Sequence, residues 1–417
     1  MDTAAPLSTP LPPARPSKDW AIVTLIGTGH FLSHFYMLCL PPLFLAWREE
    51  FDVSFATLGL SLALMSGVTA VGQTPVGFLV DKHGARRFLV GGTLLMALSI
   101  SAMAFAPSFF WIVVLAVLSG IGNSVIHPAD YAILAGSVET SRMGRAFALH
   151  TFTGNLGFAL APPAIALLLL ALDWRRALLV VGLLGVPVVG AILWQSRILK
   201  DQPKSRDTGP AMSGRDVLLS RPILLFFAFF LLSSMAGSGF TAFIITLMQT
   251  LWDMPLAIAS MLLTGYMIGA TGGTLVGGWF ADRTAGKTES LIVFVIGLTF
   301  AAMALMLSLG LVRMPGFVPV VVALVAGLCL GASRTPRDVM LRNAAPPGQV
   351  GKVFGFVSSG LPLGGAVMPV PMGWLLDAGY PQLLLPLVAG LLGLSLLCAG
   401  LGNGAARQPA AGAIPAE

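Results

Sequence analysis

The chain has 417 residues, of which 56% are hydrophobic and only 10% are charged. About a quarter of the residues in a soluble domain are charged, so this composition excludes an ordinary soluble protein. The formal net charge of +6 would suggest a nucleic-acid partner in a soluble chain. The three cysteines, Cys39, Cys329 and Cys398, fall within apolar segments, which does not indicate a disulfide framework.

Apolar segments follow one another along most of the chain and are separated by short polar loops. A membrane-spanning helix needs about 20 apolar residues, and the sequence predicts twelve such spans. The first six lie at residues 20–46, 55–80, 88–106, 109–136, 145–172 and 175–196. The second six lie at residues 223–251, 255–281, 290–312, 316–338, 351–376 and 381–402.

The polar segments between and around these spans define the predicted domains. Residues 1–19 are rich in proline and lack a secretory signal, so we expect a disordered cytoplasmic tail. Residues 20–197 and 222–402 form two six-helix bundles, joined by a cytoplasmic linker at residues 198–221 and followed by a tail at residues 403–417. The predicted fold class is therefore an all-α membrane protein.

Lysine and arginine are distributed unequally between the two sides of the predicted bundles. Short cytoplasmic loops carry an excess of these residues in membrane proteins. With both termini and the even-numbered loops on one side, that side holds all of the 24 basic residues except Arg48, Arg175, Arg176 and Arg313. We therefore predict cytoplasmic termini in a bacterial-type inner membrane, and the positive charge requires no nucleic-acid partner.

The two sets of spans share short sequence patterns, in the same order and at nearly the same offset. The matching pairs are residues 77–87 with 278–287, 127–130 with 335–338, and 144–147 with 351–354. Internal repeats of this kind, in parallel topology, place a substrate site between the halves near the middle of the membrane. The sequence therefore predicts two homologous halves.

The pattern G-x-L-x-D-x-x-G-x-[RK]-[RK] at residues 77–87, copied more loosely at residues 278–287, resembles the signature loop of the major facilitator superfamily. A finer set of residues is similar to the fosmidomycin-resistance branch of that superfamily: Gly29-His30 with Pro41-Pro42, residues 120–128 (GIGNSVIHP), and residues 154–157 (GNLG) with Pro162. The resemblance covers nearly the whole chain. It implies the major facilitator fold, with pseudo-symmetric bundles that rock against each other to give alternating access.

The resemblance also implies a conformational latch on the cytoplasmic side. A carboxylate next to a helix amino terminus is stabilised by about 0.3 to 1 kcal/mol. Asp81 would face the start of helix 11 and Asp282 the start of helix 5. The predicted latch residues are Asp81, Arg86, Arg145, Asp282, Arg283 and Lys352. In the alternative interpretation, these loops only anchor the chain beneath the headgroups.

Ionisable residues form two stripes within the predicted spans. His30 and His34 are four residues apart in helix 1, and Asn123, His127 and Asp130 follow at spacings of four and three in helix 4, so each set lies on one helix face. Helices 1 and 4 line the cavity in the superfamily, so the resemblance implies that the stripes face each other. Further polar residues at this depth are Gln73, His150, Asn155, Gln249 and Tyr266.

Three interpretations of the histidines and Asp130 are open. They cap helix ends and bond within the bundle, or they bind substrate or protons, since histidine titrates near neutrality. In the third, His30, His34, His127 and Asp130 form a metal site, because H-x-x-x-H on a helix suits zinc. Arg334 in helix 10 is a further candidate, because an arginine pointing into the cavity would favour an anionic substrate.

No nucleotide-binding loop, H-E-x-x-H or G-x-S-x-G motif is present, so we predict no enzyme activity and no cofactor. The favoured function is a secondary carrier, active as a monomer, that moves a small organic anion or exports a drug-like compound, either driven by a proton gradient or running downhill. The alternative is a non-transporting receptor or assembly protein that retains the fold. Ionisable groups in mid-membrane favour the carrier.

Overall fold

The computed structural model describes residues 19–138, 143–199, 218–284, 287–345, 353 and 356–407. Within these ranges all regular elements are helices, which confirms the predicted fold class. Most of the predicted tails and most of the predicted linker at residues 198–221 lie outside the described residues, whereas residues 403–407 of the predicted C-terminal tail continue the last helix.

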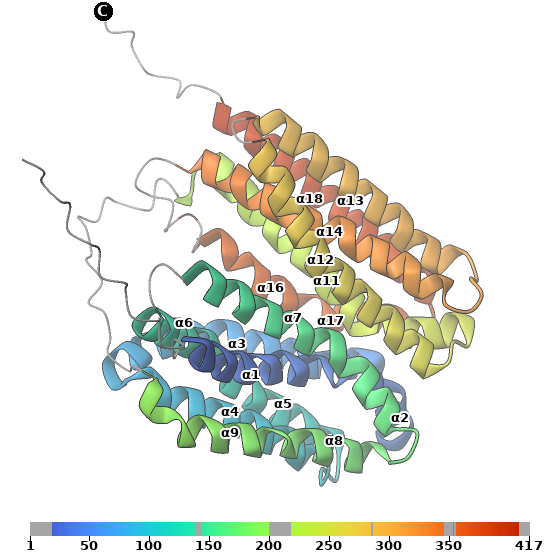
Figure 1. Cartoon of the computed structure of the whole chain (residues 1–417). Helices are drawn as coiled ribbons and strands as arrows, with labels where there is room; N and C mark the ends of the chain where they lie inside the picture. Colours follow the sequence, from blue (N-terminus) through green and yellow to red (C-terminus); the bar gives the residue numbers. More distant parts are fainter. Residues whose placement is uncertain are drawn as a thin grey trace, which may run out of the picture.

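The first half of the chain forms the lower part of the molecule in Figure 1, coloured blue to green. Its helices are α1 (Asp19–Leu38), α2 (Phe44–Phe51), α3 (Phe55–His83), α4 (Ala85–Met103), α5 (Phe109–Ser124), α6 (Ile126–Ser137), α7 (Met143–Leu168), α8 (Trp174–Leu183) and α9 (Gly185–Trp194), with the 3-10 turns η1 (Pro41–Leu43) and η3 (Ser196–Ile198).

The second half forms the upper part, coloured yellow to red, with α16 and α17 next to the first half (Figure 1). Its helices are α11 (Arg221–Trp252), α12 (Leu256–Arg283), α13 (Thr288–Leu311), α14 (Val318–Ala344), α16 (Gly360–Val367), α17 (Pro369–Asp377) and α18 (Leu384–Arg407), with the 3-10 turn η4 (Pro381–Leu383).

Eleven segments of the described chain are long and apolar enough to cross a membrane. They correspond to all the predicted spans except residues 351–376. That span is divided into α16 and α17, of 8 and 9 residues, while residues 351, 352, 354 and 355 lie outside the described ranges. The chain is therefore a multi-pass membrane protein.

Four of the predicted spans are interrupted, each close to a proline, and the first of them is divided at residues 39–40, directly before Pro41. Proline has no N–H to bond the carbonyl four residues earlier, which weakens the helix at that carbonyl. Pro128 follows the break between α5 and α6 at Val125, and Pro187 follows the break between α8 and α9 at Leu184. Pro369 begins α17 directly after the break at Met368. The break at Val125 sets the direction of α6, which carries two of the candidate site residues.

The odd-numbered loops, which follow the first, third, fifth, seventh, ninth and eleventh spans, gather at one end of the bundle. We call this end the odd-loop face; it consists of residues 52–54, 104–108, 169–173, 253–255, 312–317 and 378–380. Asp52 after α2 and Asp253 after α11 are the described non-glycine residues with positive φ, at 48° and 52°. These unusual backbone positions occupy equivalent places in the two halves, which supports the predicted repeat.

The halves contact each other along α3, α7, α12, α16 and α17. Near the odd-loop face, the Asp377 carboxylate accepts hydrogen bonds from the backbone N–H groups of Phe55 (2.7 Å) and Ala56 (2.8 Å) at the start of α3. Arg48 donates to the same carboxylate at 2.9 Å. Deeper in the bundle, the Thr264 hydroxyl donates to the Ala159 carbonyl at 2.8 Å. A carboxylate of the second half thus caps a helix of the first.

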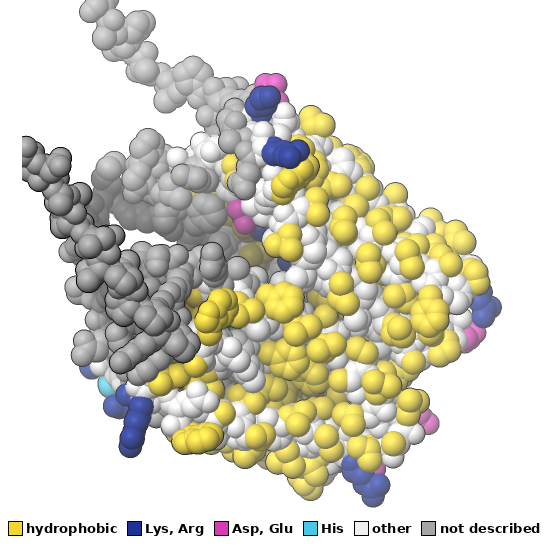
Figure 2. All heavy atoms as spheres, in the orientation of Figure 1, with side chains coloured by type: hydrophobic (Ala, Val, Ile, Leu, Met, Phe, Trp, Pro, Cys, Tyr) yellow, Lys and Arg dark blue, Asp and Glu magenta, His cyan; other side chains and the backbone are white. Residues whose placement is uncertain are grey.

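Hydrophobic side chains cover most of the visible surface between the two ends of the helices, and the charged side chains gather near those ends (Figure 2). Phe105, Leu170, Trp194 and Leu275 are among the large apolar side chains exposed on the surface. Exposed apolar surface of this extent suits contact with lipid, not with water.

Candidate functional site

Four of the five histidines of the chain come together inside the first half, between α1, α6 and α7. His30 and His34 lie one turn apart on α1, and their ring centroids are 4.3 Å apart. His127 approaches from α6 and His150 from α7, with ring centroids 5.1 Å and 3.7 Å from His30. The histidines of the predicted helix 1 stripe thus lie next to His127 of the predicted helix 4 stripe.

His30 has a defined tautomer when its ring is neutral. Its Nδ1 lies 2.7 Å from the backbone oxygen of His150, and a carbonyl oxygen can only accept, so Nδ1 carries the hydrogen. The lone pair of a neutral His30 is therefore on Nε2. That atom lies 3.3 Å from Nε2 of His127.

His150 and Asp130 form the most deeply buried polar pair of the site. The two atoms His150 Nε2 and Asp130 Oδ2 are 2.9 Å apart, and the side chains are 2% and 0% exposed. The other carboxylate oxygen, Oδ1, is buried and has no hydrogen-bond partner within the described part of the chain. Buried polar atoms are rarely left unpaired, and those that are often have a functional reason.

Glycine at position 154 allows α7 to approach the histidines of α1. A Cβ built on Gly154 would lie 2.5 Å from Cε1 of His30 and 2.8 Å from Cε1 of His34, closer than non-bonded carbons can come. Gly157, three residues on, brings α7 against the backbone of Phe31 in the same way. The GNLG sequence therefore serves close packing of α1 and α7 around the histidine cluster.

The remaining predicted path residues lie elsewhere. Asn123 on α5 donates from its amide nitrogen to the sulfur of Met37 at 3.2 Å and to the hydroxyl of Thr69 at 3.5 Å, while its Oδ1 is buried without a partner among the described residues. Arg334 is exposed on α14, in the other half of the molecule. Arg337, one turn later, is the more buried arginine; it pairs with Asp338 at 3.0 Å and lies 4.0 Å above the ring of Phe230.

The predicted latch falls largely outside the described structure. The side chains of Asp81, Arg145, Asp282 and Lys352 are not among the described ones. Arg86 is at the start of α4, and Arg283 at the end of α12 lies 4.2 Å above the ring of Trp279. The latch on the cytoplasmic side therefore remains a prediction.

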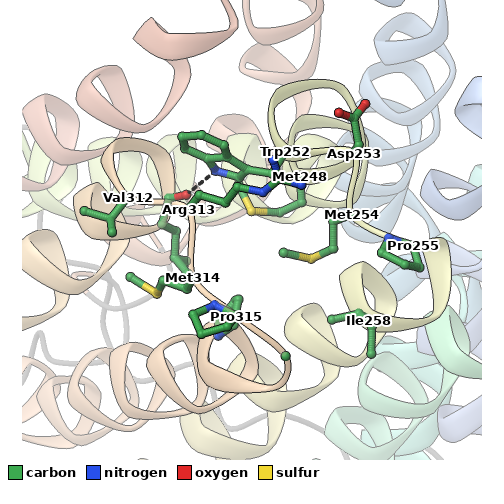
Figure 3. Close-up of a pocket in the computed structure, with 13 residues that line it drawn as sticks. Met248, Trp252, Asp253, Met254, Pro255, Ile258, Val312, Arg313, Met314 and Pro315 are labelled. Carbon is green, nitrogen blue, oxygen red and sulfur yellow. Dashed lines mark hydrogen bonds between the residues drawn. The ribbon is translucent and has the colours of Figure 1, made fainter.

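A separate cavity of about 330 Å³ opens on the odd-loop face, within the second half alone. Figure 3 shows Met248, Met254, Met314 and Ile258 around it, together with Trp252. The indole of Trp252 donates to the Leu309 carbonyl at 2.9 Å. All lining residues come from the ends of α11 to α14 and from the loops at residues 253–255 and 312–317, so this cavity has no connection to the histidine cluster.

Sequence reasoning placed His30, His34, His127 and Asp130 together but gave His150 no special role. The signal that could have identified His150 was Gly154, four residues later on the same helix. A glycine one turn from a polar residue inside an apolar span often marks close contact with a neighbouring helix. Asp377 was missed because the predicted span ended at residue 376.

Comparisons with known proteins agree with the fold. The chain is 24% identical to the fosmidomycin resistance protein of Escherichia coli over 361 residues, which is 84% of this chain and 86% of that protein. It is 30% identical over 172 residues to the uncharacterised MFS-type transporter YfnC of Bacillus subtilis, where the match spans 41% of this chain and only 42% of the relative.

Among solved structures, a bacterial homologue of the human lysosomal transporter Spinster, in an inward-facing and unoccupied conformation, has a TM-score of 0.75 at 12% identity. The superposition covers 94% of this chain and 98% of that one. The family profile of the Major Facilitator Superfamily matches residues 26–325 and, overlapping these, residues 253–409. The chain therefore belongs to the major facilitator superfamily, a family of membrane transporters and not of enzymes.

Proposed function

We propose that this transporter is a proton-coupled secondary carrier that moves a small solute by alternating access. It acts as a monomer in a bacterial-type inner membrane, with both termini in the cytoplasm. The observation that supports this proposal best is the Asp130–His150 pair, which is almost fully buried. Ionisable groups at this depth are energetically expensive and typically mark solute or proton pathways.

Asp130 is the proposed carrier of the coupling proton. Asp130 lies on α6 and faces His150, which lies on α7. His127 lies one turn before Asp130 on α6, and His30 of α1 stacks against His150. One carboxylate oxygen is held by His150, while the other is unpaired. A proton can therefore be added at Oδ1 without breaking the bond to His150.

The contacts of Asp377 support the alternating-access part of the proposal. We assign the odd-loop face to the outside, where Asp377 caps the start of α3 and binds Arg48 across the two halves. These bonds would break when the outer side opens. The predicted latch of Asp81 and Asp282 would play the same part on the cytoplasmic side, so that the two faces open in turn.

For the substrate, we propose a small organic anion taken up or a drug-like compound exported. Arg334 on α14 is exposed, and a guanidinium in the path would bind a carboxylate or a phosphonate. The printed name of the Escherichia coli relative refers to resistance to fosmidomycin, which supports export of a compound of comparable size.

The test begins with a thermal-shift screen of the purified protein against organic acids, phosphonates and sugars, because a ligand stabilises the state that it binds. Each stabilising compound is then added to proteoliposomes that contain a pH-sensitive dye. For wild type we expect compound-driven proton movement. For Asp130→Asn we expect the thermal shift to remain and the proton movement to fall by at least about 100-fold, as general acid–base groups contribute.

His83→Gln is the matched control, because His83 lies outside the cluster at the end of α3; it should behave as wild type. Proton movement in Asp130→Asn equal to that in wild type would contradict the proton site while leaving transport intact. A compound that stabilises wild type but is never carried across the bilayer would favour the non-transporting alternative.

A further inference from the structure

Three imidazoles converge where α1 meets α6. His30 and His34 come from one face of α1, and His127 comes from the first turn of α6. Each offers one ring nitrogen, and these three nitrogens all lie within 4.8 Å of one another. Imidazole is a preferred ligand of zinc and of its neighbours in the first transition row.

One of these distances already has the value expected for a metal site. Nε2 of His30 and Nε2 of His127 are 3.3 Å apart. With zinc–nitrogen bonds of about 2.0 to 2.1 Å and tetrahedral angles, two ligand nitrogens are about 3.3 to 3.4 Å apart. His30 and His127 therefore have the spacing of one edge of a tetrahedral site, and His34 lies within reach of the third corner.

The neighbours of His30 prepare its ring for binding a metal. Its Nδ1–H donates to the His150 carbonyl, which leaves the Nε2 lone pair directed at His127. Metal-binding histidines generally make this type of outer hydrogen bond, which fixes the tautomer and the orientation of the ring. His150 is in turn held by Asp130 at 2.9 Å, so the carboxylate supports the site from behind.

The other two rings carry unpaired atoms. Nδ1 of His34 and Nδ1 of His127 are buried and have no hydrogen-bond partner among the described residues. Both side chains are nevertheless only half-buried, whereas His30 is 3% exposed. The ring triad is therefore closed on the His30 side and accessible on the side of His34 and His127.

We propose that His30, His34 and His127 bind one divalent transition-metal ion of the Zn²⁺ class, with the fourth position open to an exogenous ligand. Asp130 is a supporting residue and not a ligand, because its Oδ2 is bonded to His150. Both α1 and α6 belong to the first half, so the ion links two helices of one bundle and leaves the movement between halves free. The inference goes beyond the proposed transport and does not depend on proton coupling.

The experiment is a titration of the purified, chelator-stripped full chain with Co²⁺, followed by visible absorption, and then displacement by Zn²⁺. Tetrahedral Co²⁺ absorbs strongly in the visible range and octahedral Co²⁺ weakly. Wild type and the control His83→Gln should bind one Co²⁺ per chain with the strong spectrum. His34→Gln should bind at least about 100-fold more weakly, since even outer-sphere partners change metal affinity by about 10- to 100-fold.

Asp130→Asn separates the supporting role from a ligand role, because it should keep the strong tetrahedral spectrum with a weakening of about 10-fold. Loss of the spectrum in Asp130→Asn, equal Co²⁺ affinity in wild type and His34→Gln, or only a weak octahedral spectrum in wild type would each overturn the proposal. The first outcome would make Asp130 a ligand, and either of the other two would leave the His30–His127 contact as a simple hydrogen bond.

A second measurement needs no substitution in the cluster. Wild-type protein is treated with diethylpyrocarbonate, with and without Zn²⁺, and the modified histidines are identified by mass spectrometry. Zn²⁺ should protect His34 and His127 by several-fold and leave the exposed His83 unprotected. Equal modification of His34, His127 and His83 with and without the ion would contradict the site, even if His34→Gln fails to fold.

Discussion

The two halves of the transporter share a topology but bury different side chains. Within the described residues, the fully buried ionisable side chains of the polar cluster, His30, Asp130 and His150, all belong to the first half. The buried polar side chains of the second half are Thr246, Ser260, Thr299 and Ser395. None of these four is ionisable near neutral pH, so the second half has no described counterpart of the buried histidine cluster.

The second half instead contains a helix pair packed on glycine. Gly265, Gly269, Gly273 and Gly277 repeat every fourth residue on α12, and a Cβ at each would meet the backbone of α14. Gly327 and Gly331 of α14 pack in the same way against α12. Repeats of small residues allow helix backbones to approach closely in membranes. The two halves therefore have the same topology although their interiors differ. The topology depends on span length and loop order, so the side chains inside each bundle can differ without changing it.

The largest effect should come from breaking the glycine packing. We expect Gly269→Val to lower the free energy of unfolding by about 3 kcal/mol, at the upper end for overpacking, because its Cβ would meet the carbonyl of Leu324. Thermal unfolding in detergent, with urea unfolding as a second measure, gives the change in stability.

Gly272→Val is the control in the same helix, because a Cβ at Gly272 would have no neighbour within 4 Å. It introduces the same side chain with the same helix propensity but should change stability by less than about 1 kcal/mol. Equal losses in the two variants would mean that the close approach of α12 and α14 does not stabilise the second half.

Much of the fold could be predicted because each membrane span leaves a signal in consecutive residues. Apolar runs indicated the spans, and the matching loops around Asp81 and Asp282 indicated the repeat. The helix breaks at Val125 and Leu184 were not predicted, although Pro128 and Pro187 were visible in the sequence. A proline weakens one hydrogen bond, but whether the helix bends or breaks there depends on packing that the sequence does not report.

The candidate site could be predicted only in part. The spacing of His30 with His34, and of His127 with Asp130, indicated which residues share a helix face. The 3.7 Å stacking of His30 on His150 depends on the distance between α1 and α7, which no spacing within one helix contains. The separation of Asn123 from the cluster has a similar cause, because the break at Val125 lies between Asn123 and His127.

A second, smaller effect on stability should follow from removing His150, the hydrogen-bond partner of Asp130 in the first half. In His150→Ala, Asp130 Oδ2 loses its partner inside the bundle, and we expect a loss of about 2 kcal/mol, within the range for an orphaned buried acceptor. His150→Ala combined with Asp130→Leu should recover part of this loss, because no buried polar group is then left unpaired. Thermal unfolding of the two variants measures both steps.

Ser395→Ala provides the comparison from the second half. Its hydroxyl is fully buried but donates only to the Leu392 carbonyl of its own helix, at 2.7 Å. Its removal should therefore cost no more than about 1 kcal/mol. If Ser395→Ala lowered the free energy of unfolding as much as His150→Ala, the buried polar side chains of the two halves would contribute equally to stability.

The smallest effect on stability should come from Asp377, which joins the halves near the odd-loop face. A partly exposed ion pair can contribute as little as about 0.2 kcal/mol, and a helix cap typically contributes about 1 kcal/mol, so Asp377→Ala should lower the free energy of unfolding by only about 1 kcal/mol. Its effect on accessibility should be easier to detect. In a chain without native cysteines, a reporter cysteine at Ser66, which lies close to Gly365 of the other half, should react about fivefold faster with a maleimide applied from that face.

Glu50→Gln is the matched control for this last prediction. Glu50 binds Arg175 and Trp174 near the same face, but all three residues belong to the first half. The energy of the Glu50 contacts is therefore the same whether the halves are together or apart, whereas the Asp377 contacts exist only when they are together. Faster labelling in Asp377→Ala but not in Glu50→Gln would assign the closure of this face to contacts between the halves. If labelling became faster than in wild type to the same extent in both variants, general loosening of the odd-loop face would be the cause.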